Sequence, residues 1–296
     1  MIKDNNTEKE IWIFLSHSLE DYDKVRQVRN ILEEHKLRPL MFFLKCLTDD
    51  DEIDGLIKRE IDCRTRFILC DSENSRSSAW VKREVEYIES KDKPYEVVDL
   101  SKPVHELEEQ LLSYSKKSSI YISYPRSCFG VARQLSHDLD KFDFFQTELD
   151  ADFLSAGENF EKQIIKKIEA TAESCGNFIV FLDDGSCDTR FQRFQHKEIG
   201  IILHMMEHSS CRVFPVYMSQ KADDCFSKIF PENGIRAYDH TSDVSENIFN
   251  SLLSLMLTPG EMRTYYENFK TGRTGIKDEE LASRLEKLLF SSGGKL

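Results

Sequence analysis

The chain alternates short, almost continuously apolar runs with segments of helical periodicity, and this alternation constrains its fold more than any other feature. The first predicted strands are IWIFLS (11–16), PLMFFL (39–44), RFILCD (66–71) and YEVVDL (95–100). The first predicted helices are 21–36, 52–63, 80–90 and 104–115. Strands that lack polar alternation are typical of a parallel sheet covered by helices on both faces. This part of the chain is therefore predicted to be an α/β domain.

The same series then begins again. Its predicted strands are 119–124, 143–149, 177–183 and 212–218, with a short edge strand within 232–239. Its predicted helices are 128–142, 157–172, 194–208 and 243–257. FLSHS (14–18) aligns with YISYP (121–125), so the pattern indicates an internal duplication. The expected organisation is a domain at 8–100, a helical linker at 101–116, a second domain at 117–258, and a helical, partly disordered tail at 259–296.

Charge and cysteine content exclude several classes of partner. The formal charge of −13 and the pI near 5.2 argue against general nucleic-acid binding and against an anionic membrane surface. None of the 8 cysteines forms a CxxC pair, and several lie in apolar runs, as expected of a reduced cytosolic protein. We also find no apolar signal region and no run of the ~20 apolar residues that a membrane span needs. A cytoplasmic protein is predicted.

Two pairs of residues suggest a site. Trp80 precedes Glu84 by four positions in SRSSAWVKRE, and Phe194 precedes Glu198 by four positions in FQHKE. Spacing of four places an aromatic ring and a carboxylate on one helical face. In an open parallel sheet such a face can border the crevice at the carboxyl ends of the strands, where ligands bind. From the residues alone, a solvated helix face for the glutamates and a core position for the aromatics remain open.

Several pieces of sequence, in order and at matching spacing, resemble the TIR (Toll/interleukin-1 receptor) domain family in its bacterial, NAD-cleaving form. They are FLSHS, RFILCDSENSRSSAWVKRE, YISYPRS and LSAGENFEKQIIKKIEATAESCGNFIVFLDD. The resemblance covers about 230 of the 296 residues. It implies two flavodoxin-like TIR domains, each a central parallel sheet with helices on both faces, followed by a short helical C-terminal tail.

The resemblance also implies an activity, cleavage of the nicotinamide–ribose bond of NAD+. NAD+ would be the substrate, with no bound cofactor and no metal. The implied catalytic residues are Glu84 and Glu198. The implied substrate-binding residues are Trp80, Phe194, Ser16, His17, Ser123, Tyr124, Arg126 and Gly157. A carboxylate can stabilise the developing oxocarbenium ion, and an aromatic ring can stack on the cationic pyridinium. The product is linear or cyclic ADP-ribose.

The first copy departs from the family in one loop. KCLTDDDEIDGL is rich in acidic residues from Asp49 to Asp54 and has no glycine before its helix, whereas the second copy has SAGEN (155–159). An acidic loop is expected to repel a diphosphate. One copy is therefore expected to be active and the other to regulate it or assist assembly.

The implied partners are NAD+, other TIR domains through self-assembly, and a downstream effector protein in bacterial anti-phage immunity. A non-catalytic adaptor that recruits TIR domains is the alternative, and an enzyme similar to nucleoside deoxyribosyltransferases is a third reading. Because adaptors commonly lack the glutamate that both copies keep, the enzyme is favoured. Ser18 with Asp21 is interpreted as a helix cap, and His204 with His208 as a surface pair.

Overall fold

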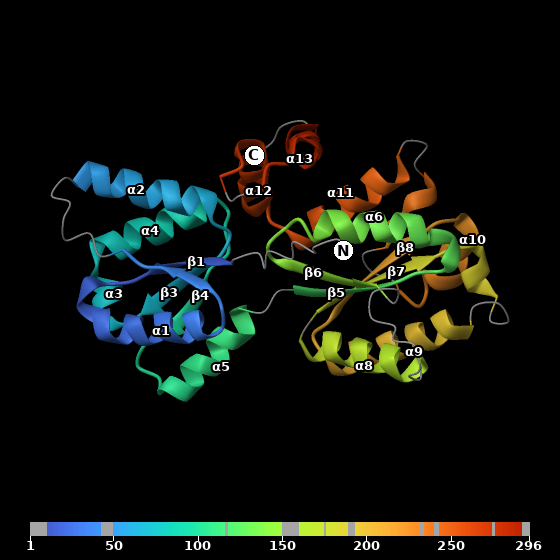
Figure 1. Ribbon diagram of the computed structural model, residues 1–296, viewed down its shortest axis with the longest axis horizontal. Helices are drawn as coiled ribbons and strands as arrows, with labels where there is room; N and C mark the ends of the chain where they lie inside the picture. The colour runs from blue at the N-terminus through green and yellow to red at the C-terminus, as the bar shows by residue number, and fades with distance from the viewer. Residues whose placement is uncertain are drawn as a thin grey trace, which may run out of the picture. The chain divides into compact units, whose positions relative to one another are not determined.

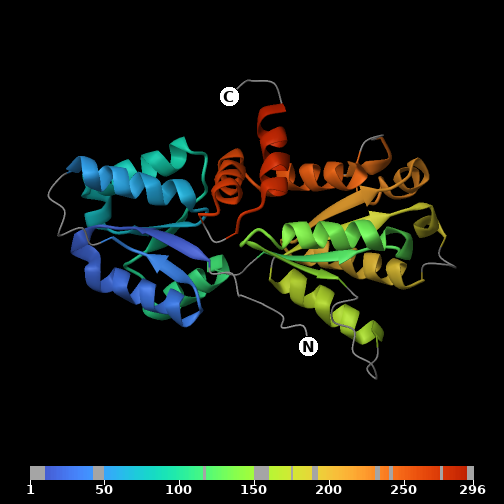
Figure 2. The ribbon, with the colours of Figure 1, turned by 45° about the horizontal axis from the view of Figure 1, so that its top comes forward.

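The computed structural model describes residues 11–42, 50–115, 118–149, 160–174, 176–188, 193–230, 234–239, 243–273 and 276–291. The chain forms two compact units, shown in Figures 1 and 2. The first unit comprises Met1–Lys116 and Leu257–Leu296, and the second comprises Lys117–Met256. The chain thus leaves the first unit, builds the second, and then returns to the first.

The first unit contains a parallel four-stranded sheet in the order β2-β1-β3-β4. Its strands are β1 (Trp12–Ser16), β2 (Arg38–Leu40), β3 (Phe67–Asp71) and β4 (Glu96–Asp99). Its helices up to residue 115 are η1 (Leu19–Asp21), α1 (Tyr22–Glu34), α2 (Asp50–Cys63), α3 (Glu73–Ser77), α4 (Ala79–Ser90) and α5 (Val104–Ser115). Helices α1 and α5 cover one face of the sheet, and α2 and α4 cover the other (Figure 1).

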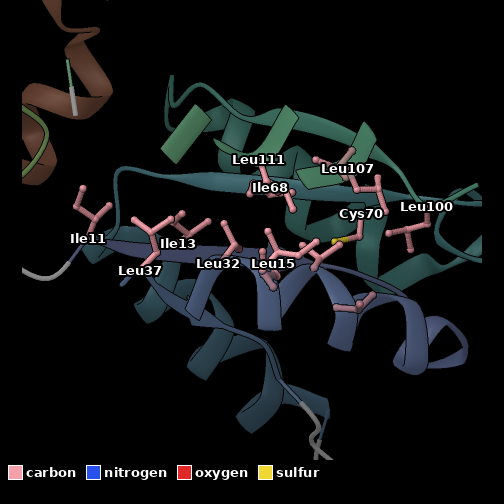
Figure 3. Close-up of a cluster of buried hydrophobic side chains, with 14 residues drawn as sticks. Ile11, Ile13, Leu15, Leu32, Leu37, Ile68, Cys70, Leu100, Leu107 and Leu111 are labelled. Atoms are coloured by element: carbon pink, nitrogen blue, oxygen red, sulfur yellow. The ribbon is translucent and has the colours of Figure 1, made fainter. Parts of the chain in front are cut away.

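Alternation along the central strands supplies both hydrophobic layers. Ile13 and Leu15 of β1 belong to the cluster that packs under α1 and α5, shown in Figure 3, whereas Phe14 between them packs with α2 and α4. In β3, Ile68 and Cys70 likewise lie on the first face and Phe67 on the second. Successive strand side chains point to opposite faces. This two-sided burial explains why the strand sequences are continuously apolar.

The second unit contains a parallel five-stranded sheet in the order β6-β5-β7-β8-β9. Its strands are β5 (Ser118–Ser123), β6 (Phe145–Leu149), β7 (Asn177–Leu182), β8 (Arg212–Tyr217) and β9 (Ile235–Arg236). Its helices are η2 (Arg126–Cys128), α6 (Phe129–Leu139), α8 (Phe160–Glu173), η3 (Asp184–Cys187), α9 (Arg193–His208), α10 (Gln220–Phe226), η4 (Ala237–Asp239) and α11 (Val244–Met256). Figures 1 and 2 show α6 and α11 on one face of this sheet and α8 and α9 on the other.

Both sheets follow the same winding. Numbered within each unit, the strand orders are 2-1-3-4 and 2-1-3-4-5, which is the flavodoxin-like order of doubly wound folds. In each unit the first and last helices of the series cover one face of the sheet, and the middle helices cover the other. The predicted α/β fold with two parallel sheets is confirmed.

Two segments expected to lie outside the first domain are helical, as predicted, but belong to its compact unit. The segment 101–116, expected to be a helical linker, contains α5, whose Leu107 and Leu111 complete the hydrophobic cluster under α1. The segment 259–296, expected to be a helical tail, contains α12 (Pro259–Thr271) and α13 (Glu279–Ser291), which belong to the first unit. Several of their apolar side chains, including Phe269 and Leu285, are buried, while Phe290 is exposed. Burial of these faces explains why both segments belong to the compact unit.

Helix α12 begins against the turn that follows α4. Thr258 caps the helix in a capping box with Glu261, and the Thr258 hydroxyl donates to the carbonyl of Asp92 at 2.7 Å. Gly260 lies so close that a Cβ there would come within 2.0 Å of the Lys91 carbonyl oxygen and 2.4 Å of that of Asp92. The contact between this helix and the turn therefore requires glycine at position 260.

Gly260→Ala is expected to lower the free energy of unfolding of the first unit by about 1–3 kcal/mol, because the added methyl group overlaps backbone that has little room to move. Chemical denaturation measures the change. Gly55→Ala is the matched control, because Gly55 lies in helix α2 of the same unit with no neighbouring atom within 4 Å of the new Cβ. This control should be neutral or stabilising. Equal stabilities of the two variants would contradict the close approach.

Candidate functional site

A pocket of about 400 Å³ opens at the carboxyl end of β1 in the first unit. Its size lies within the usual range for small-molecule sites. It is lined by Leu15, His17, Ser18, Leu19 and Glu20 after and within β1, by Phe42, by Ile53 and Ile57 of α2, by Asn74, Ser77 and Ser78 around α3, and by Trp80 and Glu84 of α4. The pocket thus brings together an aromatic ring, a carboxyl group and several short polar side chains.

Glu84 is held by the last residue of β1. The Ser16 hydroxyl donates a hydrogen bond to Glu84 Oε2, and Ser16 itself is only 1% exposed. Helix α4 starts at a Ser78 N-cap, which accepts from the Val81 backbone N–H. Trp80 and Glu84 then lie one turn apart, and both line the pocket as their spacing predicts. The Arg83 guanidinium lies over the Trp80 ring, 5.1 Å from its centroid.

The Glu84 carboxyl group titrates close to neutral pH. Burial raises its pKa to about 7, and the hydrogen bond from Ser16 acts in the opposite direction. As a whole residue Glu84 is partly exposed, because it lies at the wall of an open pocket. Its carboxyl group is nevertheless surrounded by protein atoms. A carboxyl group with this pKa can accept and return a proton near pH 7.

His17 is the residue that follows Ser16, and its ring also lines the pocket. Its Nδ1 lies 3.0 Å from the Leu15 carbonyl oxygen, so Nδ1 carries the donated proton. Burial lowers the pKa of His17, while the Leu15 carbonyl and the charge of Asp21 act in the opposite direction. The imidazole is therefore neutral at pH 7 and adds no positive charge to the pocket.

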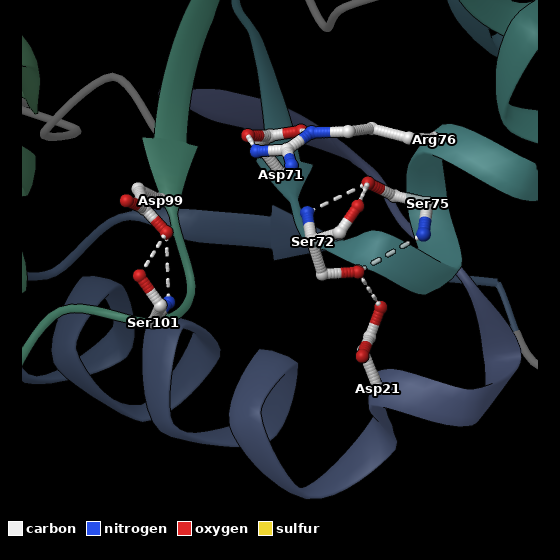
Figure 4. A network of polar contacts seen from close by, with 7 residues as sticks. All are labelled: Asp21, Asp71, Ser72, Ser75, Arg76, Asp99 and Ser101. Atoms are coloured by element: carbon white, nitrogen blue, oxygen red, sulfur yellow. Dashed lines mark hydrogen bonds and ion pairs between the residues drawn. The ribbon is translucent and has the colours of Figure 1, made fainter.

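A polar network fixes the wall formed by α3 (Figure 4). Buried Asp21 accepts hydrogen bonds from the Ser72 hydroxyl and, at 2.9 Å, from the Asn74 amide. Ser72 also caps α3 in a reciprocal capping box with Ser75. Because Asp21 binds the start of α3, its side chain is not the helix cap that the sequence predicted; Ser18 alone caps η1 by accepting from the Glu20 N–H.

The same edge carries two further polar contacts, also visible in Figure 4. Arg76 of α3 forms an ion pair with Asp71, the last residue of β3. At the end of β4, Asp99 accepts from the backbone N–H of Ser101 at 2.9 Å and from its hydroxyl at 2.7 Å. Short polar side chains thus rigidify the loops that leave the carboxyl ends of β3 and β4.

Asp51 and Asp54, acidic residues in the first turns of α2, do not line the pocket. Asp54 forms an ion pair with Lys58 at 2.7 Å, and Asp51 and Asp54 line a separate groove between α2 and α4. Helix α2 instead presents Ile53 and Ile57 to the pocket. The part of the pocket wall that α2 supplies is therefore apolar; residues 43–49 and the side chain of Asp50 lie outside the described residues.

The second unit contains the same serine–glutamate pair. Ser123, the last residue of β5, donates from its hydroxyl to Glu198 Oε2 on α9 at 2.6 Å. The Tyr121 hydroxyl also lies 3.3 Å from Glu198 Oε1, and Glu198 is only 8% exposed. The first unit has Phe14 at the strand position of Tyr121, two residues before the serine. Protein groups thus hold both oxygens of Glu198.

The structure describes only some of the other residues that were predicted to form a site in the second unit. The Tyr124 ring packs against Phe129, with centroids 5.8 Å apart, and Arg126 is exposed at the start of η2. Phe194 lies in α9, but its side chain is outside the described residues, as is Gly157. In this unit, then, the structure brings together Ser123 and Glu198 of the predicted set.

Sequence reasoning missed part of the pocket wall. Ile53 and Ile57 have the helical spacing of core residues, so nothing in their pattern distinguishes a pocket wall from a core. Asn74 lies between the strand predicted at 66–71 and the helix predicted at 80–90, in a segment that forms α3. The spacing of Ser72 and Ser75 could have predicted this helix, because a serine at the N-cap position can accept from the backbone N–H three residues later.

Part of the first unit matches a known protein family. Residues 13–110 match the family model of the TIR domain, so a TIR domain occupies this part of the first unit. The match includes all four strands of the first sheet and every residue that lines the pocket. No curated protein matches the chain. Within the described residues, no helix is both long enough and apolar enough to span a membrane.

Glu84→Gln is expected to remove a pH dependence of stability. The folded pKa of about 7 lies above the ordinary glutamate value, so the folded state retains a proton that the unfolded state loses first. The stability of the wild type should therefore fall, relative to the variant, as the pH rises from about 4.5 to about 7. We expect a relative change of about 1–2 kcal/mol, below the full value because the pocket hydrates the group.

Thermal unfolding of both proteins across this range measures the effect. The titration of His17 acts in the opposite direction, but it is present in both proteins and cancels in the comparison. A constant difference between wild type and variant at every pH would show that Glu84 is not buried as described.

Proposed function

We propose that the first unit cleaves NAD+ at the bond between nicotinamide and ribose, with Glu84 as the catalytic residue. The observation that carries the proposal is the pocket in which Trp80 and Glu84 lie together, with Glu84 hydrogen-bonded to Ser16 at the end of β1. The TIR match at residues 13–110 supports it, because the TIR family includes NAD+-cleaving members.

The chemistry requires little from the protein beyond a carboxylate in the right place. The pyridinium ring leaves as neutral nicotinamide when the glycosidic electron pair moves onto its nitrogen, so no acid is needed for the leaving group. The ribose C1′ becomes cationic, and a nearby carboxylate stabilises that charge. Water, or another nucleophile of the substrate, then attacks C1′, and Glu84 with its pKa of about 7 accepts the released proton.

Other residues of the pocket suit the parts of this substrate. The Trp80 ring offers an aromatic face for the planar, cationic nicotinamide. His17 is neutral at pH 7, so it does not repel that cation. The Asn74 amide and the Ser78 hydroxyl are short polar groups of the kind that bind ribose hydroxyls.

In this proposal the second unit is a TIR-like counterpart that does not perform the chemistry. Its Glu198 is buried, and hydroxyl groups of Ser123 and Tyr121 lie at its two oxygens. A carboxylate held in this way is poorly placed to reach a ribose. Two such units in one chain raise each other's effective concentration, which favours assembly with further TIR domains.

The wider role proposed for the chain follows the family resemblance. It would act in the bacterial cytoplasm in an immune response to phage, by depleting NAD+ or by releasing a linear or cyclic ADP-ribose product that signals to an effector protein. The acidic charge of −13 is consistent with a small-molecule substrate and protein partners, because nucleic-acid binding favours a basic surface.

The first test measures NAD+ loss and nicotinamide release by purified protein at high concentration with a crowding agent. We expect Glu84→Gln to lower the rate by at least about 100-fold, because it removes the charge that stabilises the transition state. Glu198→Gln is the matched control in the second unit and should keep the rate within about three-fold of wild type. Chromatography of the products separates linear from cyclic ADP-ribose.

Each contrary outcome has a clear meaning. Loss of activity only in Glu198→Gln would move the chemistry to the second unit and overturn the assignment. If wild type and both variants all fail to consume NAD+ when assembled, the non-catalytic adaptor becomes the better description of the chain.

The pH dependence of the rate provides an independent prediction. The carboxylate form of Glu84 is the active one, so kcat/KM should rise through about pH 7. Ser16→Ala removes the hydrogen bond that lowers the pKa of Glu84, so the midpoint should move to higher pH. An unchanged midpoint in Ser16→Ala would show that Glu84 does not set the profile. Ser123→Ala, the equivalent change in the second unit, should leave it unmoved.

A further inference from the structure

The last turn of α9, in the second unit, gathers three exposed side chains with metal-ligand chemistry. They are His204, Glu207 and His208, and one donor atom from each lies within 4.8 Å of the others. Positions i, i+3 and i+4 of a helix share one face, which explains the grouping. From the sequence, the two histidines are interpreted as a surface pair because no metal-binding carboxylate motif accompanies them. The structure adds Glu207 to the pair.

A backbone contact fixes the tautomer of one imidazole in this cluster. Their ring centroids lie 4.4 Å apart, and His208 Nδ1 lies 2.8 Å from the His204 carbonyl oxygen. A carbonyl oxygen only accepts, so Nδ1 of His208 carries the proton and Nε2 keeps its lone pair. A backbone carbonyl that fixes the tautomer through the other ring nitrogen is a typical support for a ligating histidine.

The position on the helix also favours a cation. His208 is the last residue of α9, where the helix dipole places partial negative charge. In the part of the chain that the structure describes, no ion pair engages the Glu207 carboxylate. Its charge is therefore available to a bound ion.

We propose that His204, Glu207 and His208 bind a divalent transition-metal ion, with Zn²⁺ as the best match. Two imidazole nitrogens and one carboxylate oxygen suit zinc and its neighbours better than magnesium or calcium, which prefer oxygen ligands throughout. Bonds of about 2.0–2.2 Å at tetrahedral angles place two ligand atoms about 3.3–3.6 Å apart, so the exposed side chains, whose donor atoms lie within 4.8 Å of one another, rotate to close the site. Three protein ligands leave a further position for water or another donor.

The site is separate from the proposed NAD+ chemistry, since Glu84 lies in the other unit. It can therefore be tested without any activity assay. The metal-free full chain is titrated with Zn²⁺ in competition with a chromophoric chelator, and then with Ni²⁺. The variants are His204→Gln, His208→Gln and Glu207→Gln. The matched control is His137→Gln, because His137 is also an exposed helical histidine of the second unit that lies beside a carboxylate, that of Asp138.

We expect one histidine-dependent ion per chain, with affinity lowered about ten-fold or more by either histidine change and less by Glu207→Gln. His137→Gln should bind as wild type does. Equal binding by wild type and both histidine variants would overturn the proposal, as would an equal loss in His137→Gln. If Glu207→Gln binds Zn²⁺ as tightly as wild type does, only the two histidines are ligands, and the three-ligand assignment is wrong.

Discussion

A hydroxyl group at the end of the central strand holds a carboxyl group on a facing helix, and each unit is arranged around this contact. Ser16 donates to Glu84 in the first unit, and Ser123 donates to Glu198 in the second. A buried carboxyl group without a donor would be costly, so the serine makes its position tolerable. The parallel sheet supplies the geometry, because the strand end and the helix start meet at the same edge.

The two units differ at one aromatic position beneath this contact. Phe14 fills the core under β1 of the first unit, while Tyr121 fills the equivalent place in the second and brings a hydroxyl to Glu198. The Tyr121 hydroxyl thus gives Glu198 a second protein partner that the phenylalanine of the first unit cannot supply to Glu84.

Local pattern predicted most of the strands and longer helices and part of the site, but not the short helices α3 and α10. Continuous apolar runs predicted the strands because β1 and β3 are buried on both faces, and spacing of four predicted the shared face of Trp80 and Glu84. What could not be predicted depends on contacts between distant segments. Asp21 binds Ser72 and Asn74 across more than fifty residues, and no local pattern records that partner.

The C-terminal helices illustrate the same limit. Residues 259–291 look polar partly because polar side chains, Glu261, Thr264 and Asn268 of α12, occupy buried positions beside Tyr265 and Phe269 of the same helix. Gly260 reads as an ordinary loop glycine until the backbone of Lys91 and Asp92 is seen against it. A helix can thus be predicted from its sequence while the surface it packs on cannot.

The return of the chain to the first unit has a consequence for synthesis. The 140 residues from Lys117 to Met256 emerge from the ribosome between α5 and α12. At about 5–20 residues per second, this interval lasts roughly 7–28 seconds. Throughout it the turn at Lys91 and Asp92 has no helix to cover it, so the unit that begins first is finished last. A nascent chain stalled in this interval would carry a complete pocket on a domain that is still open to chaperones and proteases.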